Sequence, residues 1–408
     1  MSTSPRELPE APGSSDAYRW IILLVATLAQ AGTAVVFLGV GALAGFIQED
    51  FDLSGVQTGL LITAVGLAPL VALLPTGRLL DRRSERLIIT GGALLLAAGA
   101  AAAALSESYL IVLAVLLIGG TGYSASQPGG SKVVAAWFPP HQRGLAMGIR
   151  QTGLPLGGAL AAAILPAVAD QSDWRAALLV AAAVAALSGI VFGLAYRPPA
   201  QIAYASVPGF RSELGGLLRM KPVRMAMQSG LAMVSIQFVI ISYLMLYLRD
   251  VHNIPLTRGA WMLFGVQSAG VAGRVVLAAW SDRVSNRMLP VALAAGVAAL
   301  GAAIFGLTGA GPSFPILLVL SIVAGFFAFG WYGPWVVFVA EAAPGHAVGM
   351  TLALAMTANQ LGIVLAPPLF GLLLDLTGGY VVPWLITGGF LAFVTVRVGL
   401  AARPGRHN

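Results

Sequence analysis

Cysteine and charge are what this 408-residue chain has least of. It contains no cysteine, which excludes a disulfide framework and a thiolate metal site. Only 10% of its residues are charged, whereas a soluble globular chain carries about 25%. Because 58% of the residues are hydrophobic, such a chain cannot keep its surface in water. The sequence also lacks H-E-x-x-H, G-x-S-x-G and phosphate-loop motifs, so we expect no enzyme, no metal site and no cofactor.

Long apolar runs occupy most of the chain. A helix needs about 20 apolar residues to cross a bilayer, and runs of this length recur between short polar segments that hold nearly every charge. The pattern predicts an all-α membrane protein with twelve transmembrane helices. Their approximate spans are 19–47, 57–77, 87–105, 109–137, 144–169, 174–196, 222–248, 259–280, 288–309, 314–340, 346–374 and 380–402.

The charges between the runs are distributed unevenly. One set of alternate loops holds most of the Lys and Arg residues, and the other set is mainly acidic. Cytoplasmic loops of membrane proteins carry such an excess of Lys and Arg, so we expect both termini to be cytoplasmic in a multi-pass protein of the plasma (inner) membrane. The net charge of +7 then has a topological origin, and we expect no nucleic-acid partner. The basic set is Arg82, Arg83, Arg86, Arg143, Arg197, Arg211, Arg219, Lys221, Arg224, Arg283 and Arg287.

The sequence repeats itself at an offset of 201 residues. D-R-R-S-E-R at 81–86 aligns with D-R-V-S-N-R at 282–287, and both contain D-R-x-S-x-R. Six helices in each half give the two copies the same orientation. The predicted parts are a cytoplasmic N-terminal tail (1–18), an N-terminal bundle (19–196), a cytoplasmic linker (197–221), a C-terminal bundle (222–402) and a cytoplasmic C-terminal tail (403–408).

The loop motif carries a family resemblance. Gly77-x-x-x-Asp81-Arg82-x-Ser84-x-Arg86 resembles the signature cytoplasmic loop of the major facilitator superfamily, which usually has Gly where Ser84 stands. The resemblance implies that the Asp and Arg residues of the loop pair with each other and with helix ends. The alternative is that these arginines only set the topology. The implied gate residues are Asp81, Arg82, Arg86, Asp282, Arg283 and Arg287.

Further segments resemble the same family. The stretch from Trp137 to Gly148 and the pair Trp174-Arg175 are similar to segments of its organic-anion carriers. The resemblance implies a major facilitator fold with two six-helix bundles related by a parallel pseudo-two-fold axis. It also implies a secondary active transporter that works by alternating access, with its substrate path between the halves.

Two arginines lie inside predicted spans. A charge in the hydrocarbon costs at least about 2.5 kcal/mol and usually faces a cavity or a partner. Arg150 and Arg274 each lie seven residues from the cytoplasmic end of their helix, which is roughly 10 Å at 1.5 Å per residue. In the major facilitator arrangement their helices pack together, so we expect the two guanidiniums on facing walls of one cavity, with a substrate carboxylate between them. Alternatively, each could reach the cytoplasmic surface or bond backbone carbonyls.

The position of Arg274 narrows the expected substrate. Gly273-Arg274 resembles the eighth helix of oxalate/formate exchangers and monocarboxylate transporters, in which such an Arg binds the carboxylate of the substrate. Those exchangers place a Lys on the eleventh helix, which this sequence lacks, although Arg150 could supply the second charge. The resemblance therefore implies transport of a small organic anion, a mono- or dicarboxylate, by anion exchange or proton symport.

Other side chains are candidates for the same cavity, although aromatic pairs and interhelical amides often serve packing alone. Gly41 with Gly45, and Gly153 with Gly157, are spaced to let helix backbones approach closely. The predicted substrate-binding set is Arg274, Arg150, Gln30, Tyr123, Gln127, Gln237, Gln267, Trp331, Tyr332, Trp335, Asn359 and Gln360.

Two competing functions stay open. The glycines at 144, 153, 157 and 158 resemble the antiporter signature of proton-coupled drug and metabolite exporters, although the first helix lacks the buried acid that such exporters commonly use. A membrane enzyme or sensor would need a catalytic motif, and none is present. The expected partners are a small anionic substrate and the lipid bilayer, with the protein as a monomer.

Overall fold

A computed structural model describes residues 16–198, 209–284, 286–309 and 313–401. The described secondary structure is entirely helical, because a backbone inside a bilayer must satisfy its own polar groups. Both predicted tails lie wholly or mostly outside the described residues, as do 199–208 of the linker and Ser285 of the second motif. The expected all-α membrane architecture is confirmed. Eleven described helical segments are long and apolar enough to span a bilayer, and a shorter apolar helix, Val381–Arg397, follows them.

The N-terminal half contains the first six spans. The fourth consists of three consecutive helices and the fifth of two. The elements are α1 (Asp16–Phe51), α2 (Gly55–Arg82), α3 (Glu85–Ala104), α4 (Tyr109–Gly120), η1 (Thr121–Ala125), α5 (Ser126–Trp137), α6 (Pro140–Gln151), α7 (Gly153–Gln171) and α8 (Trp174–Ala195).

The C-terminal half contains the other six spans, after a short helix, α9 (Phe210–Arg219), within the linker; its fourth span consists of two helices and its fifth of one. The sequence analysis assigned no helix there. The remaining elements are α10 (Lys221–His252), α11 (Leu256–Ser281), α12 (Met288–Leu307), α13 (Phe314–Gly330), α14 (Tyr332–Ala342), α15 (Val348–Thr377) and α16 (Val381–Ala401).

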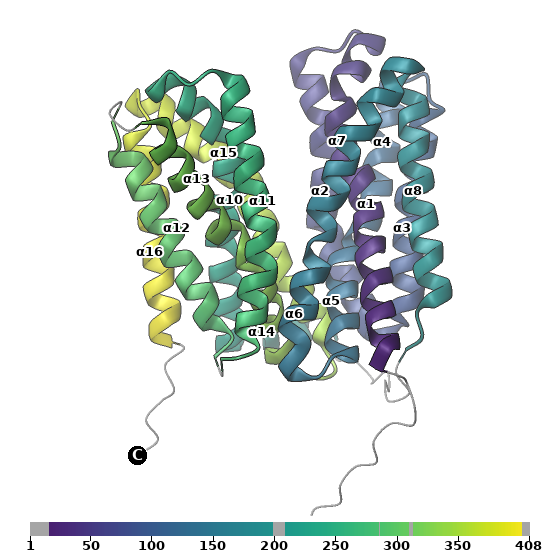
Figure 1. The fold of residues 1–408 in the computed structure, drawn as a ribbon. Helices are drawn as coiled ribbons and strands as arrows, with labels where there is room; N and C mark the ends of the chain where they lie inside the picture. Colours follow the sequence, from purple (N-terminus) through teal and green to yellow (C-terminus); the bar gives the residue numbers. More distant parts are fainter. Residues whose placement is uncertain (1–15, 199–208, 285, 310–312, 402–408) are drawn as a thin grey trace, which may run out of the picture.

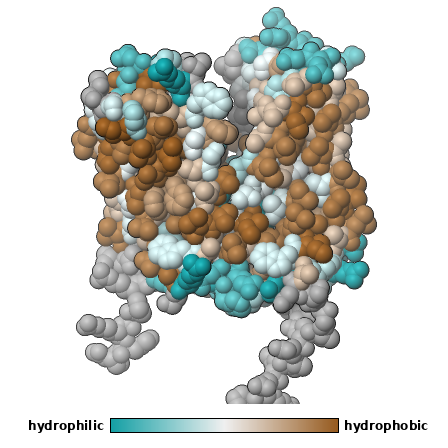
Figure 2. Space-filling model, viewed as in Figure 1, coloured by the Kyte–Doolittle hydropathy of each residue, from teal (hydrophilic) through white to brown (hydrophobic). Residues whose placement is uncertain are grey.

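The two halves stand side by side and touch at one end (Figure 1). We call this the closed end; α1 begins there, α16 ends there, and α5 and α6 approach α14. At the opposite, open end the two bundles lie apart (Figure 1). Figure 2 shows apolar residues over the middle of both bundles and polar residues near the ends, as expected for a surface in contact with lipid.

Three spans are interrupted at proline-dependent positions. Proline has no N–H, so the carbonyl four residues before it loses its helical partner. Pro128 stands four residues after Ser124 in η1, Pro155 four after Gln151 at the end of α6, and Pro334 four after Gly330 at the end of α13. The helices break at these three places, which all lie near the middle of their spans.

Glycines allow the halves to approach closely at the closed end. A Cβ on Gly77 of α2 would lie 2.7 Å from the carbonyl oxygen of Gly349 in α15, and one on Gly148 of α6 would lie 2.6 Å from the carbonyl oxygen of Arg274 in α11. Each contact therefore tolerates no side chain. The helices of Arg150 and Arg274, α6 and α11, thus pack together, as the family resemblance implies.

The four glycines expected to mediate helix packing divide into two groups. Gly153 and Gly157 lie against the backbone of α1, as the spacing predicts. The prediction for Gly41 and Gly45 is wrong, because a Cβ at either position would meet nothing within 4 Å. Small-residue spacing identifies a smooth helix face but not whether another helix covers it.

Candidate functional site

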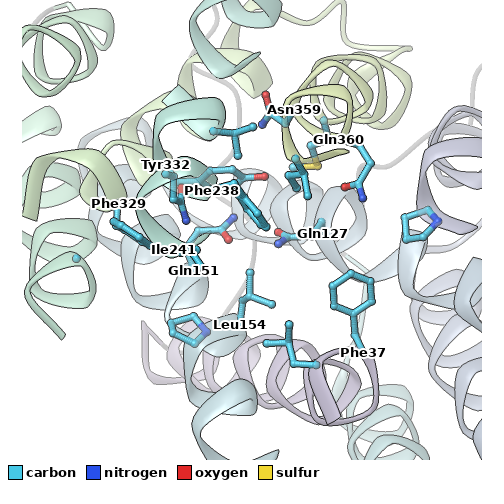
Figure 3. A pocket seen from close by; sticks show the side chains of 18 of the residues that line it. Phe37, Gln127, Gln151, Leu154, Phe238, Ile241, Phe329, Tyr332, Asn359 and Gln360 are labelled. Atoms are coloured by element: carbon cyan, nitrogen blue, oxygen red, sulfur yellow. The ribbon is translucent and has the colours of Figure 1, made fainter. Parts of the chain in front are cut away.

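A cavity of about 330 Å³ lies between the two halves. Figure 3 shows its wall, with Phe37 of α1, Gln127 of α5 and Leu154 of α7 on the N-terminal side, and Phe238 of α10 and Asn359 of α15 on the C-terminal side. Eight members of the predicted substrate-binding set line it: Tyr123, Gln127, Gln237, Gln267, Arg274, Tyr332, Asn359 and Gln360.

Among the described residues that line the cavity, Arg274 is the charged one; the others are neutral, and none is acidic. Its side chain is 6% exposed. Its Nη1 donates to the carbonyl oxygen of Gln151 at 2.7 Å, and its Nε donates to that of Phe329 at 3.3 Å. The guanidinium therefore has two neutral backbone acceptors and no described carboxylate partner, which is the carbonyl-bonded alternative of the sequence analysis.

Arg150 does not face this cavity, which corrects the expectation of two opposed guanidiniums. It is fully buried and points from α6 into the N-terminal half, toward α5. Its Nη1 donates to Ser131 Oγ at 3.1 Å, and its Nη2 donates to the carbonyl oxygen of Ser126 at 2.5 Å. A Cβ on Gly130 would collide with its Nε, so glycine makes room for the guanidinium. The rotation of α6 about its axis separates the two arginines despite their matching depth.

Three further candidates lie behind the cavity wall. Trp331 and Trp335 are fully buried within the C-terminal half, where Trp335 Nε1 donates to the carbonyl oxygen of Ala226 at 2.9 Å. Their shared face is a packing face, so the prediction that they line the cavity is wrong. Gln30 is also fully buried, and its Nε2 lies 3.4 Å from Gln151 Oε1. It contacts a lining residue without lining the cavity.

Gln151 is a cavity residue that the sequence analysis missed. Its side-chain Nε2 is buried without a hydrogen-bond partner among the described residues, as is Oε1 of Gln127. On the opposite wall, Gln360 Nε2 donates to the carbonyl oxygen of Gly66 at 2.9 Å and so joins α15 to α2. The cavity therefore presents amide groups with unused hydrogen-bonding capacity beside one cation.

At the closed end, Asp81 joins the two halves. Its carboxylate accepts the backbone N–H groups of Gly349 and Met350, both at 2.7 Å, at the beginning of α15. The positive end of the helix dipole adds to this attraction. The cation beside Asp81 is Lys132 of α5, at 3.2 Å, which also lies 3.1 Å from the buried Glu85.

Asp282 makes the symmetric contact from the C-terminal half. It accepts the backbone N–H groups of Gly144 and Leu145 in α6, at 2.7 and 2.8 Å. Arg287 pairs with it at 2.7 Å and donates to the carbonyl oxygen of Pro140. Both carboxylates therefore accept two backbone N–H groups from a helix in the opposite half.

The motif arginines behave differently from one another. Arg287 lies in a small network, because Glu341 accepts from it at 3.3 Å and from Arg143 of the other half at 3.4 Å. Arg82, Arg86 and Arg283 are exposed, and their side chains form no ion pair with a described residue. The expected pairing of Asp81 with the arginines of its own loop is therefore wrong, because Lys132 reaches it from α5. Lys132 and Glu341 were missed because they lie far from both motifs in sequence, and Glu85 was missed although it lies within the first motif.

The linker helix α9 lies across the same end. Leu217 of α9 packs in one apolar cluster with Ala347 and Met350, and Glu213 Oε2 lies 3.8 Å from Arg78 Nε of α2. Burial raises the pKa of the Glu213 carboxyl above its ordinary value, and the neighbouring Asp81 carboxylate raises it further. The helix thus contacts both halves beside the Asp81 contact.

Sequence comparison places this arrangement in a family. Residues 21–367 match the family described as Major Facilitator Superfamily. The chain belongs to the Major Facilitator Superfamily. An uncharacterized MFS-type transporter of Mycobacterium tuberculosis (strain ATCC 25618 / H37Rv) is 30% identical over 402 residues, which are 96% of this chain and 88% of that protein. The hexuronate transporter of Bacillus subtilis (strain 168) is 23% identical over 382 residues, with 88% of this chain and 89% of that protein covered.

Solved structures of the superfamily share the fold. The fucose:proton symporter FucP of E. coli in its outward conformation superposes with a TM-score of 0.78 at 19% identity, covering 95% of this chain and 100% of that chain. The family match and the fold identify this major facilitator protein as an integral multi-pass membrane transporter and not an enzyme.

Proposed function

We propose that the protein transports a small hydroxylated organic anion with one carboxylate, of the sugar-acid class, by alternating access. The observation that carries the proposal is the cavity wall, in which Arg274 is the charged residue and no acid is present. A guanidinium binds a carboxylate through two parallel hydrogen bonds. An anion in this cavity would meet a desolvated cation whose present partners are neutral carbonyls.

The rest of the wall supports a hydroxylated monoanion over a dianion. Arg150 is held inside the N-terminal half, so a second carboxylate would find no second cation at the cavity. Gln127 and Gln151 offer unpaired amide atoms to hydroxyl groups, and Phe37 and Phe238 offer apolar faces. The relative named as a hexuronate transporter favours the same class of substrate.

The membrane orientation is part of the proposal. The closed end carries the Arg-rich loops, and cytoplasmic loops are the basic ones. We therefore place this end and both termini in the cytoplasm, in the plasma (inner) membrane, so that the open end faces outward. The proposed transporter works as a monomer. Because none of the described cavity-lining residues is an acid that could titrate, we propose that coupling comes from anion exchange or from a proton carried with the substrate.

Ligand-dependent thermal stability tests the proposal. A ligand that binds the folded state alone raises the melting temperature. D-Glucuronate should do so for the wild type, and D-glucose, which has no carboxylate, should not. Arg274→Gln should lose the effect, because removing the partner of a buried charge costs about 2 to 5 kcal/mol of binding free energy. Arg274→Lys should bind D-glucuronate weakly, because an ammonium group cannot donate the two parallel hydrogen bonds of a planar guanidinium.

Controls and transport assays complete the test. Arg397→Gln removes an exposed arginine and should leave the shift unchanged. In liposomes, exchange requires an anion inside, whereas proton symport responds to a pH gradient. Uptake of a cation, or full D-glucuronate transport by Arg274→Gln, would contradict the proposal.

A further inference from the structure

The carbonyl of Gln151 is freed by a proline one helical turn later. In an uninterrupted helix it would accept the backbone N–H of residue 155, and Pro155 has none. The helix breaks at this place, between α6 and α7, and the freed oxygen lies 2.7 Å from Arg274 Nη1. Pro155 and Gln151 both line the cavity. The break therefore supplies the cavity with a backbone acceptor.

This hydrogen bond crosses from one half of the protein to the other. Arg274 belongs to α11 of the C-terminal half, and Gln151 ends α6 of the N-terminal half. The Nε of the same guanidinium donates to the carbonyl oxygen of Phe329, one residue before the end of α13 in another broken span. One turn nearer the closed end, Gly148 touches the backbone of Arg274. The guanidinium thus joins two broken helices beside the tight contact between α6 and α11.

An anion would compete for these hydrogen bonds. A guanidinium has two bidentate faces, and each includes Nη1 or Nε, the nitrogens that now donate to carbonyls. A carboxylate offers the guanidinium a negative charge and two parallel acceptors, which a single neutral carbonyl does not. A carboxylate that accepts two hydrogen bonds from the guanidinium therefore weakens the bonds from Arg274 to the carbonyls of Gln151 and Phe329. The link between the halves is weakened with them.

We propose that Pro155 is a positioning residue of the substrate site: it exposes the Gln151 carbonyl to hold Arg274 across the interface, so that anion binding at Arg274 releases the closed end. This inference rests on the proposed function, since it needs an anion at Arg274. It assigns the coupling between substrate and conformation to one backbone acceptor and its proline. Anion binding and release of the closed end then share one chemical group.

Restoring the missing N–H tests the proposal without touching the charge. In Pro155→Ala and Pro155→Val, residue 155 can donate to the Gln151 carbonyl and compete with Arg274. Pro155→Val keeps most of the side-chain bulk, which separates the N–H from the change in size. Pro166→Ala restores an N–H in the same helix, away from the cavity, and is the matched control. Proline is the least favourable residue inside a helix, so all three variants should fold.

Spin-label distances report which end is closed. The chain has no cysteine, so cysteines can be introduced directly. Leu87 of α3 and Leu289 of α12 are exposed near the closed end, and Leu105 and Leu307 are exposed near the open end. Without ligand, Pro155→Ala and Pro155→Val should lengthen the 87–289 distance and shorten the 105–307 distance, with a shift in state populations of about tenfold or more. Pro166→Ala should match the wild type.

D-Glucuronate should move the wild-type distances in the same direction and change those of the two Pro155 variants little, while still raising their melting temperatures. Wild-type distances in both Pro155 variants would overturn the inference, whatever the anion does. If D-glucuronate changed neither the melting temperature nor the distances of the wild type, the proposed function would fail. In that case a shift in the Pro155 variants would show a link between the halves that is not controlled by this anion, which also overturns the inference.

Discussion

At the closed end, one carboxylate from each half accepts hydrogen bonds from the opposite half. Asp81 accepts two backbone N–H groups of α15, and Asp282 accepts two of α6. Hydrogen bonds to a charged group each contribute about 1.5 to 3 kcal/mol. Because these bonds cross the interface, they stabilise the closed end relative to any state in which the halves separate there.

Asp81→Asn should therefore favour opening of the closed end. The neutral amide keeps one acceptor oxygen but loses the charge that attracts the helix dipole and Lys132. We expect a longer 87–289 spin-label distance without ligand and an altered transport rate. Asp375→Asn changes an exposed aspartate near the open end and is the control. Unchanged distances and transport in Asp81→Asn would remove Asp81 from the gate.

Glu213 gives the linker helix a pH dependence. Its pKa is raised by burial in the docked helix, so the docked state favours the protonated carboxyl. For a raised pKa, the stabilisation is present at low pH and is lost as the pH rises through that pKa. Glu213→Gln imitates the protonated form. It should raise the melting temperature at neutral pH, and the difference from the wild type should shrink as the pH falls.

Thermal melts from neutral pH downward, with Glu107→Gln as an exposed control, measure this effect. A difference that grew on acidification would contradict the assignment of a raised pKa.

At the scale of elements, α6 and α11 approach each other closely at a glycine. Gly148 has Ala278 Cβ and the carbonyl oxygen of Arg274 within 2.6 Å of the place where its own Cβ would be. The proline-dependent break follows at the end of α6. The helix is thus tightly held at one side of the break and freed from its normal hydrogen bond at the other.

Gly148→Ala should force α6 and α11 apart. Overpacking of a tight contact costs about 1 to 3 kcal/mol, and here that cost falls on the closed state alone. The 87–289 distance should lengthen and the resting population should move toward the opposite state. Gly45→Ala adds the same methyl group where nothing lies within 4 Å, and its distances should equal those of the wild type. Equal behaviour of the two variants would refute the packing argument.

At the scale of the whole molecule, two six-helix bundles surround one cavity and touch at one end (Figure 1). The contacts across that end come in symmetric pairs, α2 with α15 and α6 with α11. Opening the closed end requires both pairs to separate. Alternating access then follows from a rocking motion of two similar bodies about the cavity.

Topology can be tested by labelling in cells. Cysteines replacing Arg82, Arg143 or Arg283 should react with an impermeant maleimide only after the membrane is permeabilised, because basic loops stay in the cytoplasm. A cysteine replacing exposed Glu107, near the open end, should react from outside and serves as the control. Reaction of any of the three loop positions from outside would reverse the proposed orientation.

The sequence by itself determined the spans, the duplication, the family and the presence of two buried arginines. Apolar run length, a repeated motif and the cost of a charge in lipid are properties of the chain that need no tertiary contact. The helix break after Gln151 could also have been predicted, since Pro155 stands four residues later, although the prediction was not made.

Only the tertiary structure decided where side chains point. Arg150 and Arg274 lie at matching depth, yet the rotation of α6 sends one into its own bundle while the other reaches the cavity. Trp331 and Trp335 share a face as expected, and packing of α14 turned that face inward. Lys132, rather than a motif arginine, pairs with Asp81. Each outcome depends on the rotation of a helix about its axis, which is set by the neighbours it packs against and not by its own periodicity.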